Sequence, residues 1–141
     1  NIATDVVTEL ANEGSDTVQT GLAALTLAVH VENLAYTGIG NFLGTGNVLA
    51  NTIIGGAGND TLNGGIGADT LVGGSGNDIY VIDNAADAIV ESAAEGTDTM
   101  QTALASYTLA DNVENLTYTG VVAFAGTGNN LDNTITGGAA V

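Results

Sequence analysis

The chain has 141 residues, with 16 Asp and Glu, one His and no Lys or Arg, so its formal net charge is −16. This length fits a single domain. Phosphate recognition depends on Lys and Arg, so the composition excludes nucleic-acid binding and adhesion to an anionic bilayer. Cys is absent, which excludes disulfides and thiolate metal sites. No apolar run approaches the ~18 residues of a membrane span, so we expect no membrane insertion.

The first part of the chain, residues 1–54, is one copy of a long repeat. A constant offset aligns 5–56 with 87–138 without a gap, and 32 of the 52 aligned positions are identical. The motif VENL, for example, stands at 31–34 and again at 113–116. Gly is also frequent, with 21 residues. Self-similarity at a fixed period predicts an architecture of stacked units.

The central part, residues 55–81, consists of three consecutive nine-residue units. Each unit has the pattern G-G-x-G-x-D-x-U-x, where U is a large apolar or aromatic residue: GGAGNDTLN, GGIGADTLV and GGSGNDIYV, with Leu62, Leu71 and Tyr80 at U. A blurred unit precedes them at 46–54, where Asn51 replaces the Asp.

A nine-residue unit has a direct geometric meaning. Six Gly-rich residues reverse the chain, because Gly tolerates positive φ, and three residues form a short strand whose central side chain points inward. Two units then make one full coil, and successive coils stack as parallel ladders around a thin core of U residues. We therefore predict an all-β fold, a parallel β-roll or β-helix solenoid of short strands joined by Gly- and Asp-rich turns.

The last part, residues 82–141, is the second copy of the long repeat and ends within a unit. The nine-residue pattern slips by two residues near 91–93, and Asp98 and Met100 then resume it. Counting in nines places the inward residues of the two flanks at four further positions: Leu27, Tyr36, Leu109 and Tyr118. We expect 1–54 and 82–141 to be degenerate solenoid flanks around 55–81.

The three central units resemble the RTX, or haemolysin-type, calcium-binding nonapeptide family. Ca²⁺ takes six to eight oxygen ligands, and it combines carboxylates with backbone carbonyls. Gly turns leave carbonyls accessible, and the Asp of each unit adds one negative charge. The resemblance implies a Ca²⁺ cofactor, bound between turns that lie two units apart in the sequence and stack on the same edge.

The resemblance also implies the ligands. The first site would use the carbonyls of Gly56, Gly58, Gly73 and Ser75 with the carboxylates of Asp60 and Asp78. The second site, on the opposite edge, would use the carbonyls of Gly65, Gly67, Ile82 and Asn84 with the carboxylates of Asp69 and Asp87. The turn 82–87 has no Gly, so this second site departs from the pattern, and Asp83 is an alternative ligand. A third site, between 46–51 and 64–69, would lack one charge at Asn51.

Other interpretations of the acidic and catalytic-type residues remain open. The Asp residues could instead form a solvated acidic face or turns closed by their own side chains. Glu32 and Glu114, in the VENL motifs, suit solvated or turn-capping positions. His30 is not part of a metal-spaced cluster, and the motifs of zinc proteases, α/β-hydrolases and P-loop NTPases are missing. We expect no enzyme activity.

The pattern as a whole favours a calcium-binding structural module of a secreted or cell-surface bacterial protein. Family resemblance implies export by type I secretion and folding outside the cell, where Ca²⁺ is abundant. The alternative is a self-assembling or adhesive surface segment whose main role is protein interaction. The chain begins and ends within repeat units, so we expect a segment of a longer array or a protomer that stacks end to end with other copies.

Overall fold

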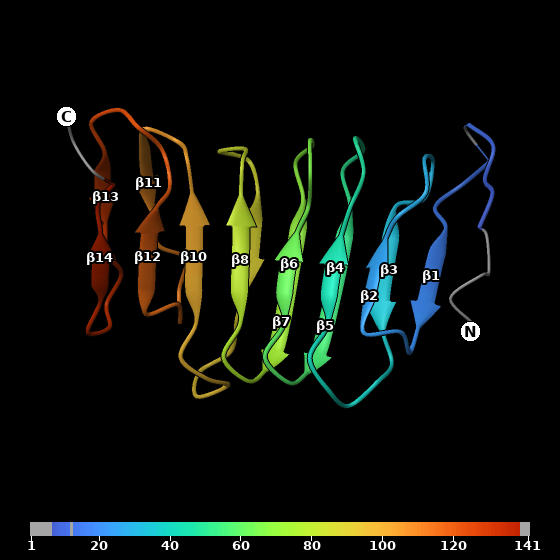
Figure 1. Cartoon of the computed structure of the whole chain (residues 1–141), viewed down its shortest axis with the longest axis horizontal. Coiled ribbons are helices and arrows are strands. Elements are labelled where there is room, and N and C mark those ends of the chain that lie inside the picture. Colours follow the sequence, from blue (N-terminus) through green and yellow to red (C-terminus); the bar gives the residue numbers. More distant parts are fainter. Residues whose placement is uncertain (1–6, 12, 139–141) are drawn as a thin grey trace.

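The structure, a computed structural model, describes residues 7–11 and 13–138 (Figure 1). Across these residues there is no helix, and so none that could cross a membrane. They form fourteen short strands: β1 Thr17–Thr20, β2 Ala24–Thr26, β3 Asn33–Tyr36, β4 Leu43–Thr45, β5 Thr52–Ala57, β6 Thr61–Asn63, β7 Thr70–Ser75, β8 Ile79–Ile82, β9 Ala88–Val90, β10 Thr99–Thr102, β11 Ser106–Thr108, β12 Asn115–Tyr118, β13 Ala125–Thr127 and β14 Thr134–Thr136.

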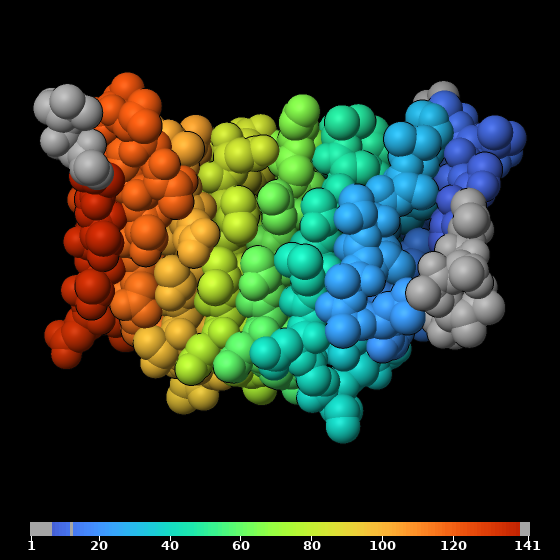
Figure 2. Space-filling model, in the orientation of Figure 1, coloured from blue at the N-terminus to red at the C-terminus, as the bar shows by residue number. Residues whose placement is uncertain are grey.

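The strands alternate between two faces of a solenoid. One face is the five-stranded sheet β1-β3-β5-β7-β9, and the other is the seven-stranded sheet β14-β12-β10-β8-β6-β4-β2. Strands β11 and β13 pair separately. The pairings among the described strands are parallel, and Figure 2 shows the coils following one another in sequence order along the long axis. The prediction of an all-β parallel solenoid is confirmed.

The core is two columns of inward side chains, one from each face. In the central coils the residues predicted at U stack in register: Leu62 pairs with Tyr80, and Leu71 pairs with Ile53, the equivalent residue of the unit at 46–54. All four are fully buried. Since each side chain packs between the coils above and below it, no single coil could bury this core alone.

The residues predicted to point inward in the flanks do so: Leu27, Leu109 and Tyr118 are buried, and Tyr36 packs against the core. They are not, however, the central residues of the flanking strands. The central residues of the flanking strands are Leu25, Leu34, Tyr107 and Leu116, each two residues before the position that counting in nines predicts. The reason is coil length. Thr17 pairs with Asn33 and Asn33 with Thr52, so the first coil is shorter than two regular nine-residue units and the second is longer.

The second copy of the long repeat has the same unequal coils but lies on the opposite face. Strand β1 belongs to the five-stranded sheet, whereas its counterpart β10 belongs to the seven-stranded sheet. This follows because the offset between the two copies covers an odd number of half-coils. An extra-long coil, in which Ile79 pairs with Thr99, absorbs the two-residue slip that the sequence places near 91–93.

Aromatic pairs fill the flanks where the inward position is Gly. A Cβ on Gly44 would lie 2.7 Å from the Phe42 ring, so only Gly leaves room for that ring in the core. Phe42 is 2% exposed and stacks on Tyr36 with ring centroids 4.6 Å apart. Tyr118 and Phe124 form the same stacked pair in the second copy.

The three-part division of the chain at 54/55 and 81/82 stays a prediction about sequence type. Strand β5 crosses the first of these boundaries and β8 crosses the second. The sheets therefore run continuously from the flanks into the central units.

Candidate metal centre

Carboxylates line both edges of the solenoid and are linked from coil to coil. On one edge, the Asp60 N–H donates to Asp78 Oδ1 (2.7 Å) and the Asp78 N–H donates to Asp98 Oδ1 (2.8 Å). On the other edge, the Asp69 N–H donates to Asp87 Oδ1 (3.1 Å). These five Asp residues are between 1% and 8% exposed, so they are not a solvated acidic face.

In the described part of the chain, five carboxylates have one buried oxygen without a hydrogen-bond partner: Asp16, Asp60, Asp69, Asp78 and Glu91. In the three central units this oxygen is Oδ2 of Asp60, Asp69 and Asp78. A buried unpaired oxygen is expensive, and an ionised one more so. The structure thus presents one free anionic oxygen in each central unit, facing a turn that is made of glycines.

The first Gly of each unit leaves space for this oxygen, which a Cβ atom would occupy. A Cβ on Gly55 or Gly64 would collide with Oδ2 of the Asp five residues later, Asp60 or Asp69. The Gly55 Cβ would also lie 2.9 Å from the carbonyl oxygen of Gly73, in the next coil. An Asp oxygen and a carbonyl of the neighbouring coil therefore converge beside Gly55.

Other glycines of the turns allow the coils to approach each other. Gly74 and Gly76 have φ of 92° and 132°, a region that favours Gly. A Cβ at these positions would collide with the carbonyls of Gly56 and Gly58 in the coil before. The turn backbones consequently stack with carbonyl oxygens between them.

The cost of leaving these carboxylates without a cation is visible in their pKa values. Burial raises the pKa of Asp60 and Asp69 above the usual range. Burial raises the pKa of Asp78 to about 6, and the negative charge of Asp60 adds to this shift. No Lys or Arg side chain can neutralise these carboxylates, because the chain contains neither residue. Oxygen-only donors, buried and anionic, fit a hard cation such as Ca²⁺.

A family model described as the RTX calcium-binding nonapeptide repeat matches residues 45–80 in four copies. Residues 45–80 are RTX repeats. The Ca²⁺ cofactor is thereby confirmed, and the match takes in one unit before the three regular ones, the blurred unit that contains Asn51. No curated protein and no solved structure matches the chain.

The residues predicted for the first calcium site come together between two RTX coils. Asp60 and Asp78 are hydrogen-bonded, and the Gly73 carbonyl lies beside Gly55. The Ser75 carbonyl accepts the Gly58 N–H (2.9 Å). The ligand set itself stays a prediction, and Asp60 Oδ2, Asp78 Oδ2 and the Gly73 carbonyl are its best-supported members.

The predicted second site is also assembled, but protein hydrogen bonds occupy several of its oxygens. Both oxygens of Asp87 accept backbone N–H groups, one from Asp69 and one from Asn84 (3.1 Å each). The Asn84 side-chain amide donates to the Gly67 carbonyl, and the Asn84 carbonyl accepts the Asp87 N–H. This site also stays a prediction, and Asp69 Oδ2 is its one buried unpaired side-chain oxygen among the described residues.

Asn side chains replace the cation in the flanks. At Asn51, which stands in the Asp position, Oδ1 accepts the Asn47 N–H (2.7 Å) and Nδ2 donates to the carbonyls of Val31 (3.0 Å) and Glu32 (3.2 Å). Asn133 repeats these contacts in the second copy. An amide thus binds the carbonyls of the preceding coil without metal.

Sequence reasoning missed Glu91 and left Asp98 as either a ligand or a solvated group. Carboxylate oxygens of Asp78, Glu91 and Asp98 lie within 4.8 Å of one another. The signal available in the sequence is the two-residue slip that Glu91 begins. The Glu residues of the VENL motifs cap turns, as expected: the Asp98 N–H donates to Glu114 Oε2 (2.8 Å).

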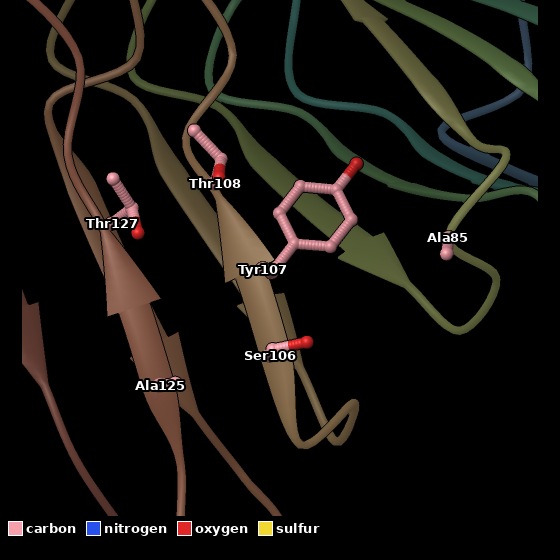
Figure 3. Close-up of a pocket in the computed structure, with 6 residues that line it drawn as sticks. All are labelled: Ala85, Ser106, Tyr107, Thr108, Ala125 and Thr127. Atoms are coloured by element: carbon pink, nitrogen blue, oxygen red, sulfur yellow. The ribbon is translucent and has the colours of Figure 1, made fainter.

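A cavity of about 510 Å³ lies where β9 and β11 fail to pair (Figure 3). The Tyr107 ring projects from β11 towards the loop of Ala85, and its hydroxyl donates to the Asp87 carbonyl (3.2 Å). Among the described residues, no charged side chain lines this cavity.

His30 lies at a turn position. Its φ is 69°, like that of its counterpart Asn112 at 64°, and His and Asn both tolerate this conformation.

Proposed function

We propose that the chain is a structural module that folds outside the cell when its RTX turns bind Ca²⁺. The observation that carries the proposal is the set of buried, unpaired oxygens of Asp60, Asp69 and Asp78. Each of them belongs to a different unit of a chain without a single Lys or Arg. The RTX repeats and the solenoid fold are structural in character, and no catalytic role is proposed.

Charge supplies the mechanism. Without a cation, the stacked carboxylates of one edge repel each other, and the Gly-rich turns lose much conformational entropy on folding. We expect residues 46–90 to be largely unfolded in that state. Ca²⁺ would neutralise the turns, with a dissociation constant of order 10⁻⁴–10⁻³ M for an extracellular module. Its binding free energy then appears as folding free energy.

This mechanism suits a secreted protein. RTX repeats are typical of secreted bacterial proteins. Scarce Ca²⁺ inside the cell would leave the chain unfolded for export, which agrees with type I secretion. Abundant Ca²⁺ outside would fold it, either free or attached to the cell surface.

Circular dichroism with and without Ca²⁺ tests the proposal. Millimolar Ca²⁺ should produce β-sheet signal that EGTA largely removes, whereas the same concentration of Mg²⁺ should produce much less. Asp78→Asn should weaken the Ca²⁺ response strongly, and Asp132→Asn, at an exposed position, should not. A β spectrum that is the same in Ca²⁺ and in EGTA would refute calcium-coupled folding.

End-to-end association is the second candidate, favoured by the β13–β14 end. Ile135 is 42% exposed, whereas its counterpart Ile53 is fully buried. One more coil, from a second copy, would cover it. Light scattering in Ca²⁺ should then show growth in mass that Ile135→Asp prevents and Ile39→Asp, at a residue 94% exposed, does not. A compact monomer in Ca²⁺ would refute association and leave the calcium module unaffected.

A further inference from the structure

We propose that Asp78, Glu91 and Asp98 form a further cation site beside the last glycine turn, and that it is the tightest Ca²⁺ site of the chain. It shares with the proposed function the cation and one ligand, Asp78. Two of its three carboxylates, Glu91 and Asp98, lie beyond the RTX match at 45–80. The repeat pattern therefore does not specify it.

The extra-long coil creates this arrangement. Glu91 directly follows β9, and the turn after it is pinned under the preceding coil at three points. The Gly76 N–H donates to the Glu95 carbonyl (2.7 Å), the Thr97 N–H to Asn77 Oδ1 (2.9 Å) and the Asp78 N–H to Asp98 Oδ1 (2.8 Å). The two additional residues of this coil give Glu91 a place inside the turn, where the regular units have a glycine.

Two unpaired buried oxygens face this place. Asp78 is 1% exposed, and its Oδ2 has no hydrogen-bond partner in the described structure. A Cβ on Gly73 would collide with both Asp78 Oδ2 and the Tyr80 hydroxyl, so these two oxygens are neighbours. The Tyr80 hydroxyl in turn donates to Glu91 Oε2, and Glu91 Oε1 is the second buried oxygen without a partner.

The donor set indicates which cation would bind. Three carboxylates within 4.8 Å of one another supply more negative charge than the two Asp residues of a regular site. Ca²⁺ affinity rises with the number of charged ligands, and a buried site leaves little room for the waters that Mg²⁺ retains. The site thus favours Ca²⁺ and should fill before the glycine turns.

Terbium luminescence provides the test, because Tb³⁺ occupies oxygen sites of Ca²⁺ and emits when a nearby Tyr is excited. In the intact chain the first equivalent of Tb³⁺ should emit through Tyr80, and Ca²⁺ should displace it. Glu91→Gln, which can still accept the Tyr80 hydroxyl, should weaken this first event by about tenfold or more. Tyr80→Phe should keep the affinity of the first event but lose most of its emission.

Glu95→Gln is the matched control. It removes the same charge from the same turn, but the Glu95 carboxylate bonds the Ser92 N–H (3.0 Å) and is not part of the cluster. We expect this variant to change the first event less than about threefold. Equal effects of Glu91→Gln and Glu95→Gln, or a first equivalent without Tyr emission, would overturn the proposal.

Asp60→Asn separates this proposal from the general calcium function. The variant should retain the tight first event and lose a weaker one. If it removes the first event while Glu91→Gln does not, the tightest ion lies in the glycine turns. The further site is then refuted, and the calcium-dependent module stands.

Discussion

The substitution Asp60→Asn should stabilise the chain without Ca²⁺ and lose this advantage with Ca²⁺. With the metal removed, Asp60 has a buried unpaired oxygen, which lowers the free energy of unfolding by about 1–3 kcal/mol. An Asn keeps an acceptor for the Phe42 N–H (2.8 Å) and adds a donor, as Asn51 does in the same position of its own coil. The metal-free fold should therefore become more stable by an amount of that order.

The same variant should lose the stabilisation that one Ca²⁺ supplies. At 10 mM Ca²⁺ and a dissociation constant of 10⁻⁴–10⁻³ M, one site contributes about 1.4–2.7 kcal/mol. This loss is of the same size as the gain in EGTA, so the advantage of the variant in EGTA should shrink towards zero in Ca²⁺.

Urea unfolding followed by circular dichroism measures both effects, with sucrose added in EGTA to bring the metal-free fold into range. Asp132→Asn is the control for the loss of one exposed charge, and it should behave like the unmodified chain under both conditions. The reasoning fails if Asp60→Asn is less stable than the unmodified chain in EGTA, or if it gains as much from Ca²⁺.

Three further predictions concern the hydrogen bonds of Asn51, the space beside Gly55 and the titration of Asp78, Glu91 and Asp98. Asn51→Asp should make the first RTX coil depend on Ca²⁺, because it exchanges the amide that binds two carbonyls for a charge. With sucrose added in EGTA to populate the metal-free fold, hydrogen exchange of that coil should accelerate, and unchanged protection would contradict this. Gly55→Ala should abolish one Ca²⁺ equivalent in calorimetry, since its Cβ would collide with the Asp60 carboxylate, whereas Gly40→Ala, with open space around it, should not. Burial raises the pKa of Asp78 and Asp98 to about 6 and that of Glu91 to about 7, so the folded state binds more protons than the unfolded one. In EGTA the β signal should then grow as the pH falls from about 7 to 4 and vanish as it rises again, and a signal that grows towards pH 8 would reverse the sign.

The central coils were predictable because all their half-coils have the same length. With nine residues between Leu62 and Leu71, and again between Leu71 and Tyr80, the sequence pattern fixes both the inward side chain and the stacked Asp. Register within a unit then follows, because a slip by one residue would turn the U side chain away from the core.

The flanks were harder to predict for a physical reason. In a strand, residues two apart point to the same side, so the positions of Leu25 and Leu27 are both compatible with an inward side chain. Both are in fact part of the core or packed against it. The choice between them depends on the length of the preceding turn, which can shrink or grow by two residues without altering the apolar pattern. The same ambiguity at the slip concealed Glu91.

The turns of this solenoid are stabilised in two ways, by Asn side-chain amides in the flanks and by Asp carboxylates with Ca²⁺ in the centre. The two regions should therefore differ in their dependence on calcium. In the flanks, the amides of Asn47 and Asn51 bind the carbonyls of the preceding coil, and Asn129 and Asn133 do the same in the second copy. An amide carries its own donor, so these turns are complete without metal. A carboxylate in the same position has no donor and depends on a cation from solution.

Calcium dependence should therefore be confined to the coils between these two groups of Asn residues, from the first RTX turn to Asp98. Those coils lie between two Asn-containing turns that need no ion, and both sheet ladders pass through them. Removing Ca²⁺ would then melt the centre of the solenoid rather than its ends, and the flanks would retain their local turns as templates on which the central coils re-form. Hydrogen exchange in EGTA should accordingly show loss of protection at Leu62, Leu71 and Tyr80 before Leu34 and Leu116, and the opposite order would mean that the Asn amides do not brace the flanks.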